Sequence, residues 1–427
     1  MTAVTIDNPI INSPFDEPRR HFLFSANGIT DTLGRGRRKS VYFVPVPRPR
    51  LKGKSLELNL ELTSTAEENH LINDIRTSVG LWRATHYDGA ATVTRRLLEH
   101  WQDPGRERKL FFCQVEALET IIYLTEIAPA KGGTEARKLL KRLKDANAQA
   151  TPAGHPILQR YAAKMATGSG KTVVMAMLIA WQTLNKQADD AKPRDQGPGT
   201  RDQGPLFTDR FLIVAPGITI KDRLRTQLPS DPNNYYRTLD LVPVAFQDGL
   251  GSARIVITNY HAFMLREGGE AAGLTKRVLN GKHEVNPFRE TPGQMITRLC
   301  AALGPKGPVI VLNDEAHHCY HRKPVGTVEE KLTGTAKREA ERREADARVW
   351  ISGLEALHEK RRIKAVYDLS ATPFFLAGSG YREGDLFPWV VSDFALIDAI
   401  ESGIVKVPRV PVADNTDQQE SPVYRRL

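Results

Sequence analysis

Residues 165–172 read Met-Ala-Thr-Gly-Ser-Gly-Lys-Thr, and the apolar run from Val173 to Trp181 follows directly. A glycine-rich turn that opens a buried helix directs backbone N–H groups toward phosphate oxygens. Lys171 is expected to reach the β- and γ-phosphates, and Thr172 to offer its hydroxyl to Mg²⁺. The alternative is an ordinary Gly-Ser turn before a core helix. The first interpretation predicts a nucleotide-binding loop made of Met165, Ala166, Thr167, Gly168, Ser169, Gly170, Lys171 and Thr172. The general pattern has glycine where this sequence has Met165.

An acidic pair follows a second apolar run. Residues 309–312 are four β-forming apolar residues after Pro308, which indicates a buried central strand. Asp314 and Glu315 come next, at the carboxyl end, where open α/β sheets form their ligand crevices. We expect Asp314 to hold Mg²⁺ and Glu315 to orient or deprotonate an attacking water. The alternative is a charged pair at the end of a strand, without a catalytic role.

Several possible metal ligands come directly after the acidic pair: His317, His318, Cys319 and His321. Structural zinc ligands usually occur as two closely spaced pairs, and the sequence contains no Cys-x-x-Cys pair. We therefore predict no zinc site from this run. His317 is expected instead to link the acidic pair to the end of another strand, residues 365–369, at Ser370, Ala371 and Thr372.

Together with Leu-Ser-Ala-Thr-Pro-Phe at 369–374, these strings resemble the first motor lobe of superfamily 2 helicases. The closest likeness is to the restriction (Res) subunits of type III restriction-modification enzymes, and it covers roughly residues 105–410. The resemblance implies an α/β fold, a P-loop RecA-like lobe with a mostly parallel sheet flanked by helices. It also implies ATP and Mg²⁺ as cofactors and double-stranded DNA as a partner.

The resemblance assigns further contacts to weaker motifs. Gln114 is expected to read adenine, although it could simply be a polar residue at the start of an amphipathic helix. Nucleic-acid contacts are expected from Pro216, Gly217, Thr258, Asn259 and Tyr260, each of which could also be an ordinary loop residue after an apolar strand.

Composition limits the class of protein. A chain of 427 residues with 41% hydrophobic content can form two to three domains, and its three cysteines favour a reducing compartment. There is no secretion signal and no apolar run long enough to span a bilayer, so we expect a cytoplasmic protein. The net charge of +10 suits a polyanionic partner. The basic segment 35–54 could follow a phosphate backbone or form a solvated, proline-stiffened arm.

We predict three regions along the chain. Residues 1–104 form an accessory region, extended to residue 54, with a strand at 56–62 and helices at 68–101. Residues 105–410 form the ATP-binding lobe, with helices at 114–127 and 328–357. Residues 411–427 begin a connector. Insertions are expected at 131–155, which is helical, at 186–209, where Arg-Asp-Gln-Gly-Pro occurs twice, and at 324–350.

No Gln-x-x-Gly-Arg-x-x-Arg string follows Pro373, and Glu329-Glu330-Lys331 is an unconvincing nuclease motif. We therefore expect the second motor lobe and the nuclease domain to lie outside these residues. The predicted function is the motor lobe of a DNA-dependent ATPase and translocase, the endonuclease subunit of a type III-like restriction system with a separate methyltransferase (Mod) subunit. The alternatives are a nucleotide- and DNA-binding fragment without turnover, and a repair or defence helicase without a methyltransferase partner.

Overall fold

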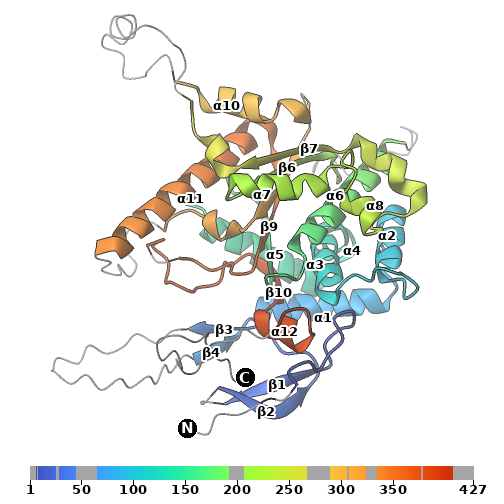
Figure 1. Cartoon of the computed structure of the whole chain (residues 1–427). Coiled ribbons are helices and arrows are strands. Elements are labelled where there is room, and N and C mark those ends of the chain that lie inside the picture. Colours follow the sequence, from blue (N-terminus) through green and yellow to red (C-terminus); the bar gives the residue numbers. More distant parts are fainter. Residues whose placement is uncertain are drawn as a thin grey trace, which may run out of the picture.

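A six-stranded parallel sheet forms the centre of the computed structural model (Figure 1). The structure describes residues 6, 8–25, 28–44, 65–191, 206–266, 289–304, 307–323, 334–376 and 378–406. The sheet consists of β5 (Arg160–Met165), β6 (Arg210–Ala215), β7 (Arg254–Asn259), β8 (Val309–Asp314), β9 (Ile363–Ser370) and β10 (Val390–Phe394). Their order is β10-β5-β9-β8-β6-β7, and every neighbouring pair is parallel. The predicted α/β fold with a parallel sheet is confirmed.

The parallel arrangement brings the predicted motifs to one edge. The carboxyl ends of β5, β8 and β9 carry the phosphate loop, the acidic pair and the Ser-Ala-Thr segment, in that order along the chain. Strand β9 lies between β5 and β8. The residues singled out from the sequence therefore meet at one edge of the sheet, where open α/β sheets form their ligand crevices.

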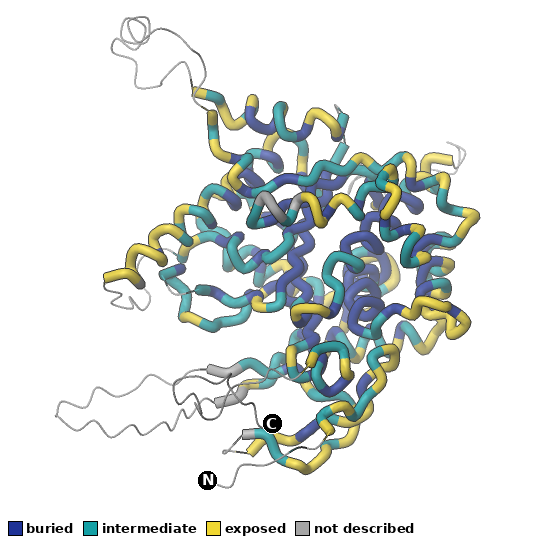
Figure 2. Tube along the Cα trace, viewed as in Figure 1, coloured by how far each residue is buried: buried dark blue, intermediate teal, exposed yellow. Residues whose placement is uncertain are grey.

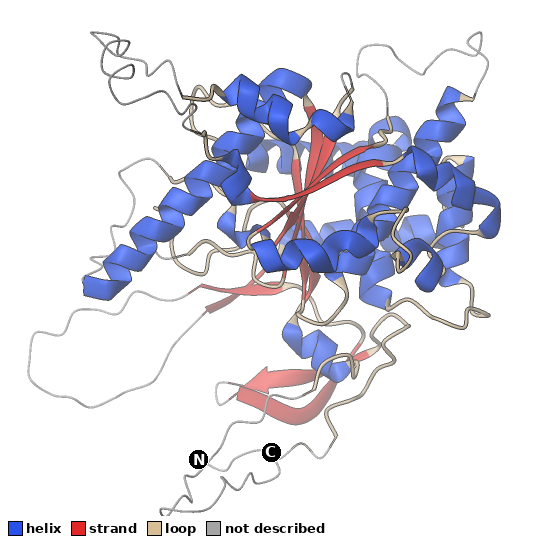
Figure 3. Cartoon of the chain, turned by 45° about the horizontal axis from the view of Figure 1, so that its top comes forward, coloured by secondary structure: helices blue, strands red, loops and turns tan. Residues whose placement is uncertain are grey.

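Apolar residues fill both faces of the sheet. In β6, Phe211, Ile213 and Ala215 belong to one buried cluster, whereas Leu212 and Val214 belong to the other. This alternation follows from the two-residue period of a strand. Figure 2 shows the buried residues gathered in the middle of the molecule, and Figure 3 shows helices on both sides of the sheet. Burial on both faces explains why the strands read as continuous apolar runs.

The helices divide between the two faces. They are α1 (His70–Ala84), α2 (Thr92–Gln102), α3 (Phe112–Ile122), α4 (Ala128–Lys131), α5 (Thr134–Gln149), α6 (Lys171–Asp190), α7 (Ile218–Arg223), α8 (Tyr235–Thr238), α10 (Pro292–Leu299), α11 (Gly334–Arg361) and α12 (Leu396–Glu401). The larger cluster includes apolar side chains of α1, α2, α3 and α6, and the smaller one those of α10 and α11. Helix α6 is buried from Val174 to Asn185, which explains its apolar sequence.

Near the N-terminus, four short strands form two antiparallel pairs that lie against the lobe. Strand β1 (Arg20–Ser25) pairs with β2 (Gly28–Arg35), and β3 (Val41–Val44) pairs with β4 (Thr65–Glu68). Arg37 Nη2 donates to Glu116 Oε2 of α3 at 2.7 Å, and Arg38 forms an ion pair with Glu401 of α12. These two arginines therefore have partners within the protein, which neither interpretation of the basic segment anticipated.

Other sequence expectations differ in detail from the structure. The region 68–101, expected to be helical, contains the two helices α1 and α2, and His86 and Tyr87 in the connection between them adopt left-handed backbone angles, φ 52° and 60°. The helix expected over 114–127 begins at Phe112, and its last turn, Tyr123–Ile127, is π-helical. The strand at 56–62, the repeat at 194–198 and 201–205, residues 329–331 and the connector 411–427 lie outside the described residues. The three region boundaries stay predictions.

No helix in the described parts of the chain has both the length and the apolar character needed to cross a bilayer.

Candidate nucleotide site

The phosphate loop connects β5 to α6 by a sharp turn. Gly168 and Gly170 have φ angles of 86° and 89°, in the left-handed region that glycine adopts without strain. The Ser169 N–H donates to the Ala166 carbonyl at 3.1 Å, and the Ser169 hydroxyl donates to the same oxygen at 2.6 Å. The loop is thus held in shape by its own hydrogen bonds, with the amino end of α6 directly behind it.

Met165 occupies the pattern's first position because that position belongs to the strand. It is the last residue of β5, it is fully buried, and it pairs with Phe394 of β10. The next N–H, that of Ala166, donates to the Phe394 carbonyl at 3.0 Å. The turn therefore begins after Met165, at Ala166. A methionine in place of glycine at position 165 leaves the geometry of the turn intact.

Gln114 braces the loop from α3. Its Nε2 donates to the Ser169 carbonyl at 3.0 Å, and its Oε1 accepts from the Phe111 N–H at 3.0 Å. The side chain is only 5% exposed. Both sequence interpretations placed Gln114 at a helix start, and the structure adds the contact with the loop. The adenine contact stays a prediction.

The acidic pair faces the loop across the crevice. Asp314 ends β8, and Glu315 follows with a left-handed φ of 50°. Lys171 Nζ lies 2.9 Å from Glu315 Oε1, and His317 Nδ1 lies 3.4 Å from Glu315 Oε2. Residues 143 positions apart in the sequence, Lys171 and Asp314, are therefore on the same side of the sheet.

The two carboxyl groups differ in their titration. Burial raises the pKa of Asp314, and the neighbouring Glu315 charge raises it further. Burial also acts to raise the pKa of Glu315, but the hydrogen bonds to His317 and Lys171 outweigh it and lower that pKa to about 2. Glu315 is therefore ionised at neutral pH.

His317 joins the acidic pair to the end of β9. Its Nδ1 lies 3.0 Å from Ser370 Oγ, which also accepts from the Thr372 N–H at 3.1 Å. Ala371 lies between these two residues. The structure thus brings together the expected chain of contacts from Glu315 through His317 to Ser370. A role in transmitting the nucleotide state stays a prediction.

Thr172 is in the first turn of α6, next to Lys171. Its carbonyl accepts a hydrogen bond from Gln227 Nε2 at 3.0 Å. Gln227 comes from a 3₁₀ turn, Leu224–Gln227, which directly follows α7. This bracing contact could not be predicted from the sequence, because a single glutamine in a short turn carries no motif.

The candidate DNA contacts are at the same edge, in the last residues of β7 or directly after β6 and β7. Pro216 and Gly217 follow β6 and are half-buried. Asn259 Oδ1 accepts from the Ala262 N–H at 3.2 Å and so caps a 3₁₀ turn. Tyr260 is stacked on Trp350 of α11, with ring centroids 5.5 Å apart and planes 5° apart. Thr258 is 8% exposed. Asn259 and Tyr260 thus have structural roles, and DNA contact by the five residues stays a prediction.

A buried polar network lies directly below the acidic pair. Asp368 of β9 pairs in register with Asn313 of β8, and Asn313 Nδ2 donates to Asp368 Oδ1 at 2.8 Å. Asp368 Oδ2 accepts from Arg160 Nε and from Trp389 Nε1, both at 2.8 Å. Trp350 Nε1 donates to Asn313 Oδ1 at 3.2 Å. The network ties β5, β8 and β9 together one residue before Asp314, and it was missed because its members are far apart in sequence.

A glycine-rich loop opposite an acidic pair, joined by a histidine to a Ser-Ala-Thr segment, is the arrangement of a P-loop motor lobe of helicase superfamily 2. The family model described as "Type III restriction enzyme, res subunit" matches residues 108–374, more than half of the chain. The chain belongs to this family, as the resemblance in the sequence led us to expect. Comparisons with curated proteins and with solved structures gave no match.

Proposed function

We propose that this chain is the ATP-hydrolysing motor lobe of a DNA-dependent translocase that acts in type III-like restriction of foreign DNA. The observation that carries the proposal is the 2.9 Å contact between Lys171 Nζ and Glu315 Oε1. It joins a phosphate loop to an acidic pair in one crevice, which is what hydrolysis of a metal-bound triphosphate requires. Family membership supports the same conclusion.

Each residue of the crevice has a proposed part in the reaction. Backbone N–H groups of residues 167–168 and 170–172 bind the phosphates, since the Ser169 N–H already donates to the Ala166 carbonyl. Lys171 leaves Glu315 to contact the β- and γ-phosphates. Glu315, ionised and no longer paired with Lys171, then orients the attacking water and accepts its proton. The change of partner by Lys171 would make Glu315 more basic when nucleotide is bound, because one of the two hydrogen bonds that lower its pKa would be lost.

Mg²⁺ fits the donors that the crevice offers. The Thr172 hydroxyl and the Asp314 carboxylate are hard oxygen donors of the kind that Mg²⁺ prefers, next to Lys171 and Glu315. When bound, the ion would neutralise charge that develops on the phosphate oxygens. The contact of His317 with Ser370 supports the proposal that Ser370, Ala371 and Thr372 transmit the nucleotide state.

The DNA and protein partners belong to the same proposal. The net charge of +10 and the loops after β6 and β7 support binding to duplex DNA through its phosphate backbone. A separate methyltransferase subunit would supply sequence recognition, as the resemblance to the Res subunits of type III restriction-modification enzymes implies. The competing candidate is a nucleotide- and DNA-binding module with negligible turnover.

Nucleotide binding and DNA-stimulated phosphate release, measured on the same protein, test the proposal. Lys171→Ala should weaken binding of a fluorescent ATP analogue roughly 10- to 100-fold, because a charge-assisted contact with the phosphates is lost. Glu315→Gln should bind normally and hydrolyse about 10²- to 10⁴-fold more slowly, because the general base is lost. Lys186→Ala, which removes another lysine of α6 paired with Asp190, should behave like the unmodified protein.

The two outcomes that matter are distinct. Normal nucleotide binding by Lys171→Ala would show that the site is elsewhere. Binding without any DNA-stimulated release in the unmodified protein would favour the binding module over the ATPase.

A further inference from the structure

Three possible metal ligands converge on one point, and one of them, His321, belongs to the run of residues for which the sequence alone predicted no zinc site. His155 is in the loop between α5 and β5, His321 follows β8 by seven residues, and Glu355 is on α11. His155 Nδ1 lies 2.7 Å from Glu355 Oε1, and His321 Nε2 lies 3.2 Å from the same oxygen. The ligand atoms of all three residues are within 4.8 Å of one another.

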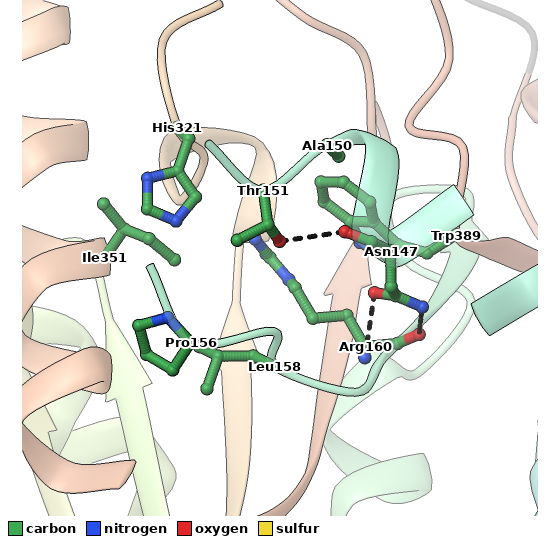
Figure 4. A pocket seen from close by; sticks show the side chains of 9 residues that line it. All are labelled: Asn147, Ala150, Thr151, Pro156, Leu158, Arg160, His321, Ile351 and Trp389. Carbon is green, nitrogen blue, oxygen red and sulfur yellow. Dashed lines mark hydrogen bonds between the residues drawn. The ribbon is translucent and has the colours of Figure 1, made fainter. Parts of the chain in front are cut away.

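The surrounding elements hold these side chains together. Figure 4 shows His321 at the wall of a pocket with Pro156, the neighbour of His155, and Ile351, one helical turn before Glu355. Arg160 and Trp389 of the buried network line the same pocket. The cluster therefore sits where a loop, a helix and the segment after the acidic strand meet.

The chemistry of the cluster matches a borderline-soft divalent ion. Two imidazoles and one carboxylate are ligand types that zinc binds. Tetrahedral zinc with bonds of about 2.1 Å places neighbouring ligand atoms roughly 3.4 Å apart. The 3.2 Å between His321 Nε2 and Glu355 Oε1 is close to that spacing, and the 2.7 Å between His155 Nδ1 and the same oxygen would have to lengthen when the ion binds. The side chains of His321 and Glu355 are only 12% and 11% exposed, so the surrounding residues restrict their movement. The side chain of His155 is 45% exposed, so an ion and a water ligand can reach the cluster from the solvent.

We propose that His155, His321 and Glu355 form a binding site for a divalent transition-metal ion, with Zn²⁺ as the best match. The ion fastens the segment that carries His317 and His321 to α11 and to the loop that leads into β5. It is separate from the Mg²⁺ proposed for the nucleotide site, and the proposal does not depend on ATP hydrolysis. Without a metal, the same residues form a histidine–glutamate cluster held by hydrogen bonds, and the experiment distinguishes these two possibilities.

Zinc titration by calorimetry on the full, tag-free chain, after treatment with a chelator, tests the site. We expect one Zn²⁺ per chain, and binding that persists in excess Mg²⁺, because Mg²⁺ prefers oxygen ligands. The visible spectrum with Co²⁺ should show the intense bands of a four-coordinate ion. Zinc should also raise the midpoint of thermal unfolding.

His155→Ala is the informative variant, because His155 is on an exposed loop and its loss should leave the fold intact, as circular dichroism will check. Zinc affinity should fall at least roughly tenfold, and the thermal shift should disappear. His70→Ala is the matched control, since His70 also faces a glutamate, with Nδ1 4.0 Å from Glu68 Oε1, but forms no three-ligand cluster among the residues that the structure describes. Its zinc binding should be unchanged. The proposal is overturned if the unmodified chain binds no stoichiometric zinc, or if His155→Ala binds it equally well.

Discussion

Replacing Asp368 by leucine should destabilise the protein far more than its single negative charge suggests. Asp368 is fully buried and accepts hydrogen bonds from Asn313, Arg160 and Trp389. Arg160, 4% exposed, would keep its charge and lose its counter-ion. Removing one partner of a buried ion pair costs about 3–5 kcal/mol in the free energy of unfolding.

The double variant Arg160→Met with Asp368→Leu gives the decisive comparison. It leaves no unpaired charge, so it should recover most of the lost stability. The side-chain N–H groups of Asn313 and Trp389 would still lack an acceptor, which leaves a deficit of about 2 kcal/mol. The double variant should therefore be more stable than Asp368→Leu alone.

Equilibrium unfolding in urea, followed by circular dichroism and by tryptophan fluorescence, measures these differences. Asp145→Ala is the control, because it removes an exposed aspartate whose Oδ2 is 2.8 Å from Lys141 Nζ on the same helix. That change should cost no more than about 0.5 kcal/mol. The reasoning is refuted if Asp368→Leu costs less than about 1 kcal/mol, or if the double variant is as unstable as the single one.

Two further predictions concern the phosphate loop and the response to acid. Gly170→Ala should cost about 1–2 kcal/mol and weaken nucleotide binding, because φ is +89° and the new Cβ would fall on the Gln114 amide. Gly251→Ala, with open space around its Cβ position, should change neither the thermal unfolding midpoint nor nucleotide binding. The hydrogen bonds from Arg298 lower the pKa of Glu290 from 4.5 to about 2, so this pair stabilises the folded state above pH 4.5 and loses that effect as the pH falls toward 2. In urea unfolding, Glu290→Gln should therefore be about 1 kcal/mol less stable than the unmodified protein at pH 7 and equally stable near pH 2. A difference in stability that does not change with pH would contradict this role of the Glu290–Arg298 pair.

Local sequence was enough to predict the central strands and the loop. The four apolar residues before Asn313 are buried on both faces, and the glycines of the loop enter a helix buried all round, so pattern and structure agree. Strand β10 was not predicted, because it contains Ser392 and Asp393 among its apolar residues. Their partners are remote: Asp393 accepts from the Ser40 hydroxyl at 2.6 Å and pairs with Lys164 at 3.0 Å.

The contrast between local patterns and remote partners also explains what could and could not be predicted at the site. The acidic pair, the loop lysine and His317 belong to short strings, and each string lies at the end of a strand, so their meeting follows from a parallel sheet. The brace from Gln227, the Asp368 network and the histidine–glutamate cluster join residues from separate elements. His155 and Glu355 are 200 positions apart, and no local pattern connects them.

The hydrogen bonds between residues 11–22 and α12 have a consequence for biosynthesis. The N–H groups of Ile11 and Asn12 donate to the Glu401 carbonyl at 2.8 and 3.0 Å, and that of Phe22 donates to the Glu401 carboxylate at 3.0 Å, across 379 positions. Ribosomes add roughly 5–20 residues per second, so these partners are made on the order of tens of seconds apart. Ile11, Asn12 and Phe22 can therefore form these hydrogen bonds only after almost the whole lobe has been synthesised. They are among the last residues to reach their final positions.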